Sequence, residues 1–272
     1  MNEVLAASPA SDWRSVDPEN TVYVEFPQGR VVIELAPNFA PKHTANIKAL
    51  VREGYFDGLA IVRSQDNYVV QWGDPDDKNP RPMKNGVRSI AEEFTTPIRK
   101  ELEFTPIQDI DGYAPQVGFA YGMPAAQDPK SGKAWMAHCY GMVGAGRDIA
   151  SDSGSGAELY VVNGHAPRHL DRNVTLVGRV LQGMPLLSSL PRGTGPLGFY
   201  EKPEQNVPLK TAKMASDVPP EERVNLEVIK TNSATFKAAV AALRNRGGDW
   251  YKVPAGHIEL CNIPLMVRVK KP

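Results

Sequence analysis

The sequence contains 24 prolines and 23 glycines among its 272 residues, and these breakers constrain its fold more than any other feature. Proline lacks a backbone donor, clashes inside helices and is confined to the edges, ends and bulges of sheets. The chain must therefore make frequent turns between short elements. Hydrophobic residues make up 42% and charged residues 23%. This composition supplies a full core and excludes collagen-like, coiled-coil and wholly disordered chains.

Charge and hydropathy narrow the class of partner. The 31 basic and 31 acidic side chains cancel to a formal net charge of +0. Because binding to phosphate backbones needs a basic surplus, the balance argues against nucleic acid as a partner. No apolar stretch approaches the roughly 20 residues that span a bilayer, so no membrane span is expected. The start, MNEVLAASPASDW, has no secretory signal and indicates a flexible arm or a mature N-terminus left after signal removal.

The two cysteines, Cys139 and Cys261, are too few for a disulfide scaffold, and nothing near them has zinc-ligand spacing. They fit either two buried thiols or one Cys139–Cys261 disulfide. A disulfide would indicate an oxidising compartment, and a periplasmic or secreted location is favoured on that ground; two thiols would leave the cytoplasm equally open. No cofactor and no metal are expected.

Hydrophobic periodicity predicts a mainly β chain. Two alternating runs around Pro27-Gln28-Gly29, within residues 21–35, have the signature of a β-hairpin. Helical spacing predicts helices in the stretch KHTANIKALVREG, over residues 183–190 and over residues 233–244. Further short strands are expected over residues 59–62, 68–72, 141–146, 158–162, 174–180, 209–215 and in the tail IELCNIPLMVRV. Many short strands with few helices indicate a barrel with helical caps.

The expected domain organisation has one β core with additions. Residues 1–20 form a flexible arm, residues 21–216 the barrel, and residues 76–140 a long insertion in it rather than a second compact domain. Residues 217–272 form a C-terminal α/β extension. We expect the insertion and the extension to pack together on the barrel, because each carries one of the cysteines.

Four stretches, in order, resemble the cyclophilin-type peptidyl-prolyl isomerases: GRVVIELAPNFAPKHTANIKALVREGYFDG, VRSQDNYVVQWGDP, GMVGAGRDIASDSGSGAELYVV and LDRNVTLVGRVLQGM. They cover most of residues 21–190, and the second and fourth are specific. The chain looks like a divergent, bacterial-like member. The resemblance implies a closed eight-stranded antiparallel barrel capped by two helices. It also implies an isomerase that assists protein folding, with proline-containing polypeptides as clients.

The chemistry of prolyl isomerisation fits such a protein without a cofactor. An amide bond resists rotation by about 18–20 kcal/mol, and uncatalysed X-Pro exchange takes about 10–100 s. As the bond twists, the prolyl nitrogen becomes pyramidal and more basic. A fixed donor beside that nitrogen therefore binds the transition state better than the ground state. Arginine suits the role because it stays protonated and its fork of donors is rigid.

The resemblance implies catalytic and substrate-binding residues when it is carried over position by position. Arg63 and Gln71 fall on the catalytic arginine and on its glutamine, which would hold the client's backbone. A single uninterrupted strand would place them on the same face, although residues 64–67 look like a turn. The substrate-binding positions, which include the apolar slot for the proline ring, are Tyr68, Val69, Gly146, Arg147, Glu158, Tyr160 and His169.

Several of these positions depart from the family's usual residues. Tyr160 replaces a phenylalanine and adds a hydroxyl that must be satisfied. Glu158 replaces a glutamine and adds a charge that would disfavour acidic clients or pair with Arg63. His169 stands for a common tryptophan, which predicts weak binding of cyclosporin. The departures predict modest activity and leave an alternative open: a cyclophilin-like module that binds proline peptides or a partner with little or no turnover.

Other patterns have ordinary explanations. A lone arginine on a strand is usually a surface residue, and only the ordered stretches favour a catalytic Arg63. His165 and His169 lie four apart, but Pro167 between them excludes a helical metal pair. The glycines of GMVGAG lack the strand-to-helix context of a nucleotide-binding loop.

Overall fold

A computed structural model describes residues 1–74, 76 and 78–270, which form two compact units. The first, here called the core unit, consists of Asp17–Thr96 and Ala137–Arg223. The second, here called the composite unit, is built from Met1–Val16, Pro97–Met136 and the chain from Val224 onward. The sequence predicted one barrel with additions; the structure instead groups the first residues, most of the insertion and the extension into a unit of their own.

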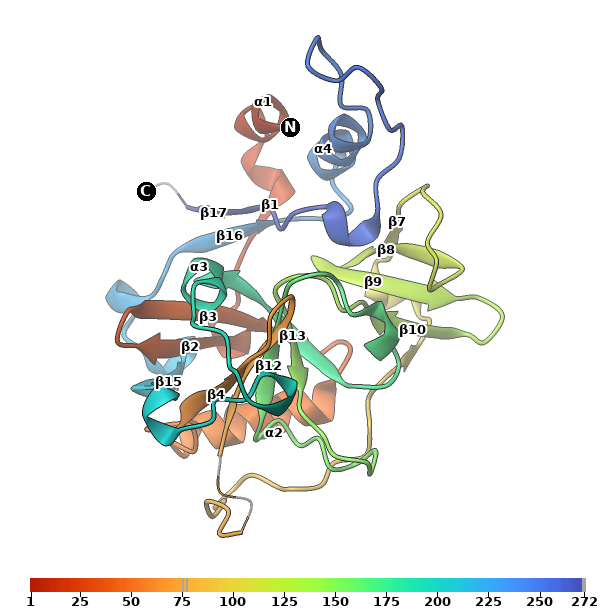
Figure 1. The fold of residues 1–272 in the computed structure, drawn as a ribbon. Coiled ribbons are helices and arrows are strands. Elements are labelled where there is room, and N and C mark those ends of the chain that lie inside the picture. Colours follow the sequence, from red (N-terminus) through yellow and green to blue (C-terminus); the bar gives the residue numbers. More distant parts are fainter. Residues whose placement is uncertain (75, 77, 271–272) are drawn as a thin grey trace. The chain divides into compact units, whose positions relative to one another are not determined.

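The core unit contains one antiparallel sheet in the order β14-β4-β5-β12-β11-β13-β3-β2-β15. Figure 1 labels several of its strands, among them β2, β3, β4 and β15. Its strands are β2 (Thr21–Phe26), β3 (Gly29–Leu35), β4 (Ala60–Ser64), β5 (Tyr68–Gly73), β11 (Met142–Ala145), β12 (Leu159–Asn163), β13 (Leu176–Gln182), β14 (Val207–Pro208) and β15 (Thr211–Met214). The sheet encloses a core of valine, isoleucine, leucine and aromatic side chains. The mainly β prediction is confirmed.

The sheet curls, and one segment of the chain connects its two sides. β14 pairs with β4 while β15, two residues further on, pairs with β2. Between them the Leu209 N–H donates to the Leu59 carbonyl and the Lys210 N–H donates to the Glu25 carbonyl. The predicted closed barrel of eight strands is not confirmed. The sheet has nine strands. Its two end strands, β14 and β15, follow each other in the chain, and each pairs with a strand on a different side of the sheet.

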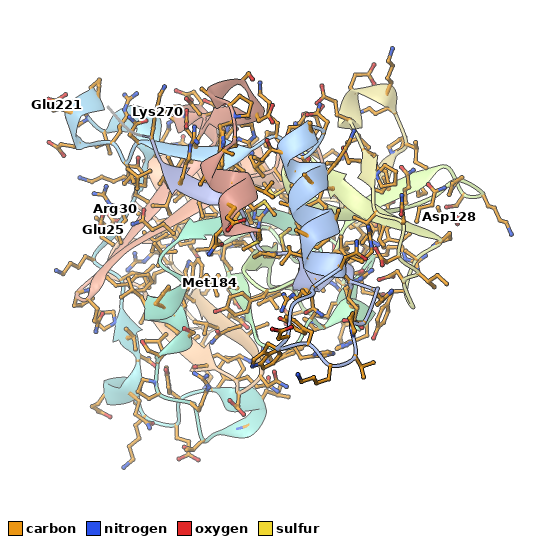
Figure 2. All side chains as sticks on the ribbon, turned by 90° about the horizontal axis from the view of Figure 1, so that it is seen from above. Glu25, Arg30, Asp128, Met184, Glu221 and Lys270 are labelled. Carbon is orange, nitrogen blue, oxygen red and sulfur yellow. The ribbon has the colours of Figure 1, made fainter. Side chains whose placement is uncertain are left out.

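The predicted hairpin is confirmed as β2 and β3, which pair from Thr21 with Glu34 to Phe26 with Gly29. Gly29 has a φ of +147°, a backbone conformation that favours glycine at the turn. Glu25 and Arg30 lie opposite each other across the strands and form an ion pair. Figure 2 labels the two residues next to each other. Register and turn chemistry therefore agree in this local element.

Helix α2 (Pro41–Arg52) matches the predicted helix closely. Pro41 stands in the first turn, where its missing N–H costs nothing, and Gly54 follows the end with a φ of +72°. Ile47 and Leu50 are buried on its inner face. The second predicted helix is the short α3 (Met184–Ser188).

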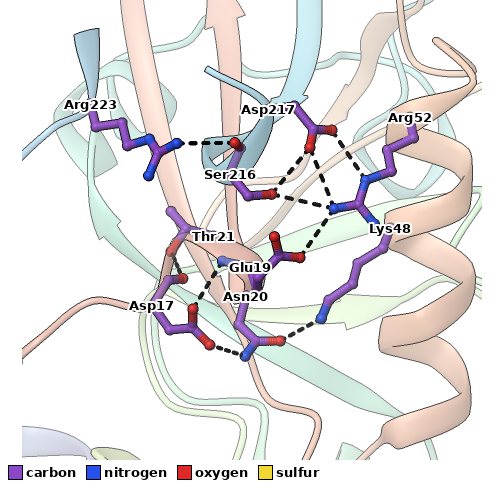
Figure 3. A network of polar contacts seen from close by, with 9 residues as sticks. All are labelled: Asp17, Glu19, Asn20, Thr21, Lys48, Arg52, Ser216, Asp217 and Arg223. Atoms are coloured by element: carbon purple, nitrogen blue, oxygen red, sulfur yellow. Dashed lines mark hydrogen bonds and ion pairs between the residues drawn. The ribbon is translucent and has the colours of Figure 1, made fainter. Parts of the chain in front are cut away.

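A polar network links α2 to segments at both ends of the core unit (Figure 3). The Arg52 guanidinium donates to Glu19 and Asp217, and Lys48 donates to Asn20. Arg223 in turn donates to the carbonyl of Ser216. These contacts explain why the core unit runs to residue 223, beyond the boundary at 216 that the sequence suggested.

The described part of the composite unit contains two sheets and two α-helices. One sheet has the order β1-β16-β17 and the other β6-β10-β9-β8-β7, where β6 (Thr96–Pro97) crosses the boundary in the sequence. The remaining elements are α1 (Asn2–Ala6), β1 (Trp13–Ser15), β7 (Thr105–Pro106), β8 (Gln116–Ala120), β9 (Met123–Asp128), β10 (Lys133–Met136), β16 (Leu226–Ile229), α4 (Ala234–Arg244) and β17 (Val267–Val269). The first 16 residues thus contain a helix and a paired strand where the sequence suggested a flexible arm.

Residues of the insertion contact residues of the extension within this unit. The ring of Phe119 on β8 contacts that of Phe236 on α4 edge-on, with centroids 5.0 Å apart. The Asp109 side chain is 5% exposed and accepts from the Arg244 Nε at 2.8 Å and from the Ile258 N–H at 3.1 Å. Apolar and ionic contacts together join segments that are distant in the sequence.

The C-terminal tail forms less β structure than its sequence predicts, and both cysteines are bonded. Of the predicted strand in IELCNIPLMVRV only β17 forms, because Pro264 interrupts it after a short 3₁₀ turn at Leu260–Asn262. Neither cysteine is free: both Cys139 and Cys261 are disulfide-bonded, in agreement with the disulfide alternative. Over the described residues, none of the helices combines the length and apolarity needed to cross a bilayer.

Asp109→Asn is expected to lower the free energy of unfolding by roughly 2–4 kcal/mol at pH 7, because the variant leaves the Arg244 charge without its buried partner. Burial alone would raise the pKa of Asp109, but hydrogen bonds from Arg244 and Ile258 outweigh it and hold the pKa below its usual value. This stabilisation is present above about pH 3.9 and is lost as the pH falls further. Denaturant titration measures both effects.

The matched control is Asp249→Asn, an exposed carboxylate of the same unit. It should change the free energy of unfolding by less than about 0.5 kcal/mol. Equal losses in the two variants would contradict a supporting role for Asp109.

Candidate active site

One cross-strand row brings the main candidate residues together in the core unit. Arg63 on β4 pairs with Gln71 on β5, Gln71 pairs with Tyr160 on β12, and Tyr160 pairs with Gly144 on β11. Side chains at directly paired positions of an antiparallel sheet project from the same face. The row therefore places a guanidinium, an amide and a phenol side by side.

A bulge sets this register. Ile61 pairs with Trp72, but the next paired residue on β4 is Arg63, opposite Gln71. Val62 is the extra residue; without the bulge it would face Gln71 in place of Arg63. The prediction that Arg63 and Gln71 share a face is thus confirmed for a different reason. They lie on two strands joined by a turn at residues 65–67, and not on one continuous strand.

Three protein oxygens hold the Arg63 guanidinium. Its Nε donates to the Leu197 carbonyl at 2.7 Å, one terminal nitrogen donates to Gln71 Oε1 at 3.1 Å, and the other donates to Gln65 Oε1. All three acceptors are neutral. Because a guanidinium carries five N–H donors, two are left over after these contacts. Burial lowers the pKa of Arg63, yet arginine remains protonated at neutral pH.

Two aromatic rings lie near this guanidinium. Its central carbon is 5.6 Å from the centroid of Tyr68 and 5.4 Å from that of Phe199. Tyr68 also stacks on His169, with planes 2° apart and centroids separated by 6.2 Å. Both rings are close enough to add cation–π attraction to the arginine.

Glu158 acts on Gln71 and orients its amide. Gln71 Nε2 donates to Glu158 Oε2 at 2.7 Å while its Oε1 accepts from Arg63. Since a carboxylate only accepts and a guanidinium only donates, the amide has one orientation. Gly146 lies beside this pair: its N–H donates to the Glu158 carbonyl, and a Cβ there would come within 3.4 Å of Gln71 Nε2. The charge of Glu158 therefore acts on Arg63 indirectly, through the amide of Gln71.

A buried relay satisfies the hydroxyl of Tyr160. The hydroxyl lies 2.8 Å from Nε2 of His138, whose Nδ1 lies 2.9 Å from Asp171. Asp171 also accepts from Arg168. The ionised Asp171 favours the tautomer with its proton on Nδ1, which leaves Nε2 to accept from the phenol. Gly144 makes room, because a Cβ there would lie 2.2 Å from the Tyr160 ring.

The pKa values in the relay follow from burial. Burial lowers the pKa of His138 and Asp171 opposes it, so the imidazole stays neutral. Burial alone would raise the pKa of Asp171, but the His138 hydrogen bond and the Arg168 charge outweigh it, and that pKa is lowered. Burial raises the pKa of Tyr160, which keeps the phenol neutral.

The fold and the sequence together match one family. Residues 21–214 match the family model described as "Cyclophilin type peptidyl-prolyl cis-trans isomerase/CLD". This chain belongs to the cyclophilin family. The crystal structure of cyclophilin AquaCyp293 from Hirschia baltica is similar over 100% of this chain and 98% of that one, with a TM-score of 0.75 and 29% identity.

Curated relatives are similar over shorter stretches. A probable peptidyl-prolyl cis-trans isomerase of Brucella suis is 48% identical over 60 residues, which are 22% of this chain and 31% of the relative. The human peptidyl-prolyl cis-trans isomerase-like 1 is 32% identical over 101 residues, 37% of this chain and 56% of that one. The matched stretch thus spans about a third to a half of these relatives.

The two remaining predicted substrate residues are Val69 and Arg147. Val69 is buried two positions before Gln71 on β5, on the same face, and pairs with Val162. Arg147 makes its hydrogen bonds outside the row: its guanidinium donates to the carbonyls of Asn173, Asp148 and Ile149. It lies over the ring of Phe94 in the cyclophilin's core unit.

Sequence reasoning missed His138, Leu197 and Phe199. His138 falls inside the stretch that the sequence assigned to the insertion, and its only signal is position: it comes shortly before the GMVGAG strand. Leu197 and Phe199 lie in a loop without a motif. In the described part of the chain, no group of three or more His, Cys, Asp or Glu side chains is arranged to hold a metal ion.

The free energy of unfolding is expected to fall as the pH drops below about 6.5, the usual pKa of an unfolded histidine. The unfolded chain then takes up a proton that folded His138 resists, because burial lowers its pKa. The loss runs from that pH down to the lower folded pKa, at up to about 1.4 kcal/mol per pH unit for one proton. Denaturant titration between pH 5 and 8 measures the slope.

In His138→Gln the slope should become shallower, because glutamine does not titrate but still offers an acceptor to Tyr160. His165→Gln, at an exposed histidine of the same unit, is the control and should keep the wild-type slope. A wild-type slope in His138→Gln would show that His138 is not the group responsible.

Proposed function

We propose that this cyclophilin accelerates cis–trans isomerisation of X-Pro bonds in proline-containing polypeptides, without a covalent intermediate. Family membership supports the reaction class. The observation that carries the proposal is the state of Arg63: it is charged, half-buried and fixed by three neutral oxygens, with two N–H donors left over. Such a group can donate to a prolyl nitrogen without first breaking a contact with a carboxylate.

Arg63 is proposed to act through differential binding. The planar ground-state amide offers little electron density on nitrogen, because the lone pair is delocalised into the carbonyl. In the twisted transition state the lone pair returns to the prolyl nitrogen, which can then accept a hydrogen bond. A donor that is already oriented and partly desolvated spends little energy on reorganisation when the bond twists. Each 1.4 kcal/mol of preference for the twisted state speeds the reaction about tenfold.

Gln71 is proposed to hold the client's backbone. One of its two amide N–H groups donates to Glu158, and the other is available to a client carbonyl. The fixed orientation of the amide supports this role, because Glu158 and Arg63 leave it no alternative. Glu158 is then a positioning residue for Gln71.

Val69 and Tyr160 are proposed to form the apolar slot for the proline ring. The sequence raised the concern that the hydroxyl of Tyr160 would spoil an apolar surface. Its hydrogen bond to His138 meets that need inside the protein. The ring can therefore serve as a phenylalanine would.

Arg63→Ala is expected to lower kcat/KM by about 10²-fold, the usual cost of removing one preorganised donor from an active site. Arg63→Lys should retain only part of the wild-type kcat/KM, because an ammonium lacks the planar fork of donors. NMR exchange of an Ala-Pro test peptide measures the rates. Arg52→Ala, an arginine of the same unit in the network of Figure 3, is the control and should match wild type.

Two results would contradict the proposal. Unchanged exchange in Arg63→Ala would remove this residue from catalysis. Peptide line shifts without any acceleration by the wild type would favour the alternative, a module that binds proline-containing segments without turnover.

A further inference from the structure

A loop of the core unit, residues 193–200, is fastened beside Arg63. The Gly193 N–H donates to the Ser64 carbonyl at 2.9 Å, and the Tyr200 N–H donates to the Val62 carbonyl at 2.9 Å. Val62 and Ser64 are the residues on either side of Arg63. Both ends of the loop are therefore tied to β4 at the catalytic position, so the loop is preorganised there.

Within this loop, Leu197 adopts an unusual backbone. Its φ is +56°, in the left-handed region that a branched aliphatic residue rarely occupies. The next residue, Gly198, also has a positive φ, and a Cβ there would lie 2.5 Å from the Cα of Gln65. This tight turn directs the Leu197 carbonyl at Arg63 Nε. Strain of this kind persists where surrounding contacts enforce it, and it is often found at functional sites.

The same turn leaves apolar surface at the site. The Leu197 side chain is 67% exposed and Phe199 is 37% exposed, and Phe199 lies against the Arg63 guanidinium. A single exposed leucine is ordinary on a protein surface. Here, however, the leucine and the phenylalanine belong to one fastened turn that contacts the proposed catalytic arginine.

We propose that Leu197 and Phe199 form an apolar wall that binds a large aliphatic or aromatic side chain next to the client's proline. This inference rests on the proposed function. Covering the wall removes apolar surface from water, which favours binding. Because the loop is already fastened to β4, little conformational entropy is lost on binding. The wall makes this cyclophilin selective for clients with a large apolar residue flanking proline.

The test compares peptides that differ only beside the proline: Ala-Ala-Pro-Ala, Ala-Leu-Pro-Ala and Ala-Ala-Pro-Leu. We expect the wild type to show a higher kcat/KM on at least one leucine peptide than on the alanine peptide. Leu197→Ala keeps the carbonyl that holds Arg63, and it should lower that ratio about four- to fifteenfold, as expected for one or two buried methylene groups. Leu197→Met, which restores an apolar side chain, should keep the ratio.

Val87→Ala is the matched control, since Val87 is 51% exposed in the same unit and its backbone is held by Asn46 of α2. It should leave the ratio at the wild-type value. A wild type without preference, or a Leu197→Ala variant with an unchanged ratio, would overturn the inference. If the wild type binds the peptides but does not accelerate exchange, the proposed function fails, and the same ratio taken from dissociation constants still tests the wall.

Discussion

The register of β4 against β5 is the constraint on which the candidate site depends. A one-residue bulge at Val62 turns Arg63 to face Gln71, and Gln71 in turn faces Tyr160 across the next strand pair. Because side chains alternate along a strand, a slip of one residue would exchange the guanidinium for a valine. The loop of residues 193–200 is bonded to the residues on either side of Arg63, so it depends on the same bulge.

The charges of Arg63 and Asp171, which lie in the same unit, are stabilised in opposite ways. Arg63 is held by neutral oxygens of Leu197, Gln71 and Gln65, so its charge is positioned but not cancelled. Asp171 has its charge fully matched by Arg168 and by the His138 N–H groups. An unpaired charge such as that of Arg63 is costly to bury, so its retention indicates a functional role. A paired charge such as that of Asp171 fixes the side chains around it. The relay stiffens Tyr160, and the row leaves Arg63 able to donate.

Local elements were predictable, and assembled ones were not. The β2–β3 hairpin and α2 carry their own turn, cap and periodicity, and their bounds agree closely with expectation. The composite unit draws on three separated stretches, none of which has a complete pattern. Strand β1 has only three residues and is recognisable as a strand only through its pairing with β16. No window of sequence contains both partners of such a pair.

The sequence by itself determined the family, the mainly β architecture and the identity of Arg63 and Gln71 as partners, because these follow from ordered motifs and short-range patterns. Tertiary structure alone decided how they meet. The bulge, the orientation of the Gln71 amide and the His138 acceptor for Tyr160 each arise from contacts between strands or loops far apart in the chain. Hydrogen bonding and packing between distant segments depend on three-dimensional register, which local residue patterns do not encode.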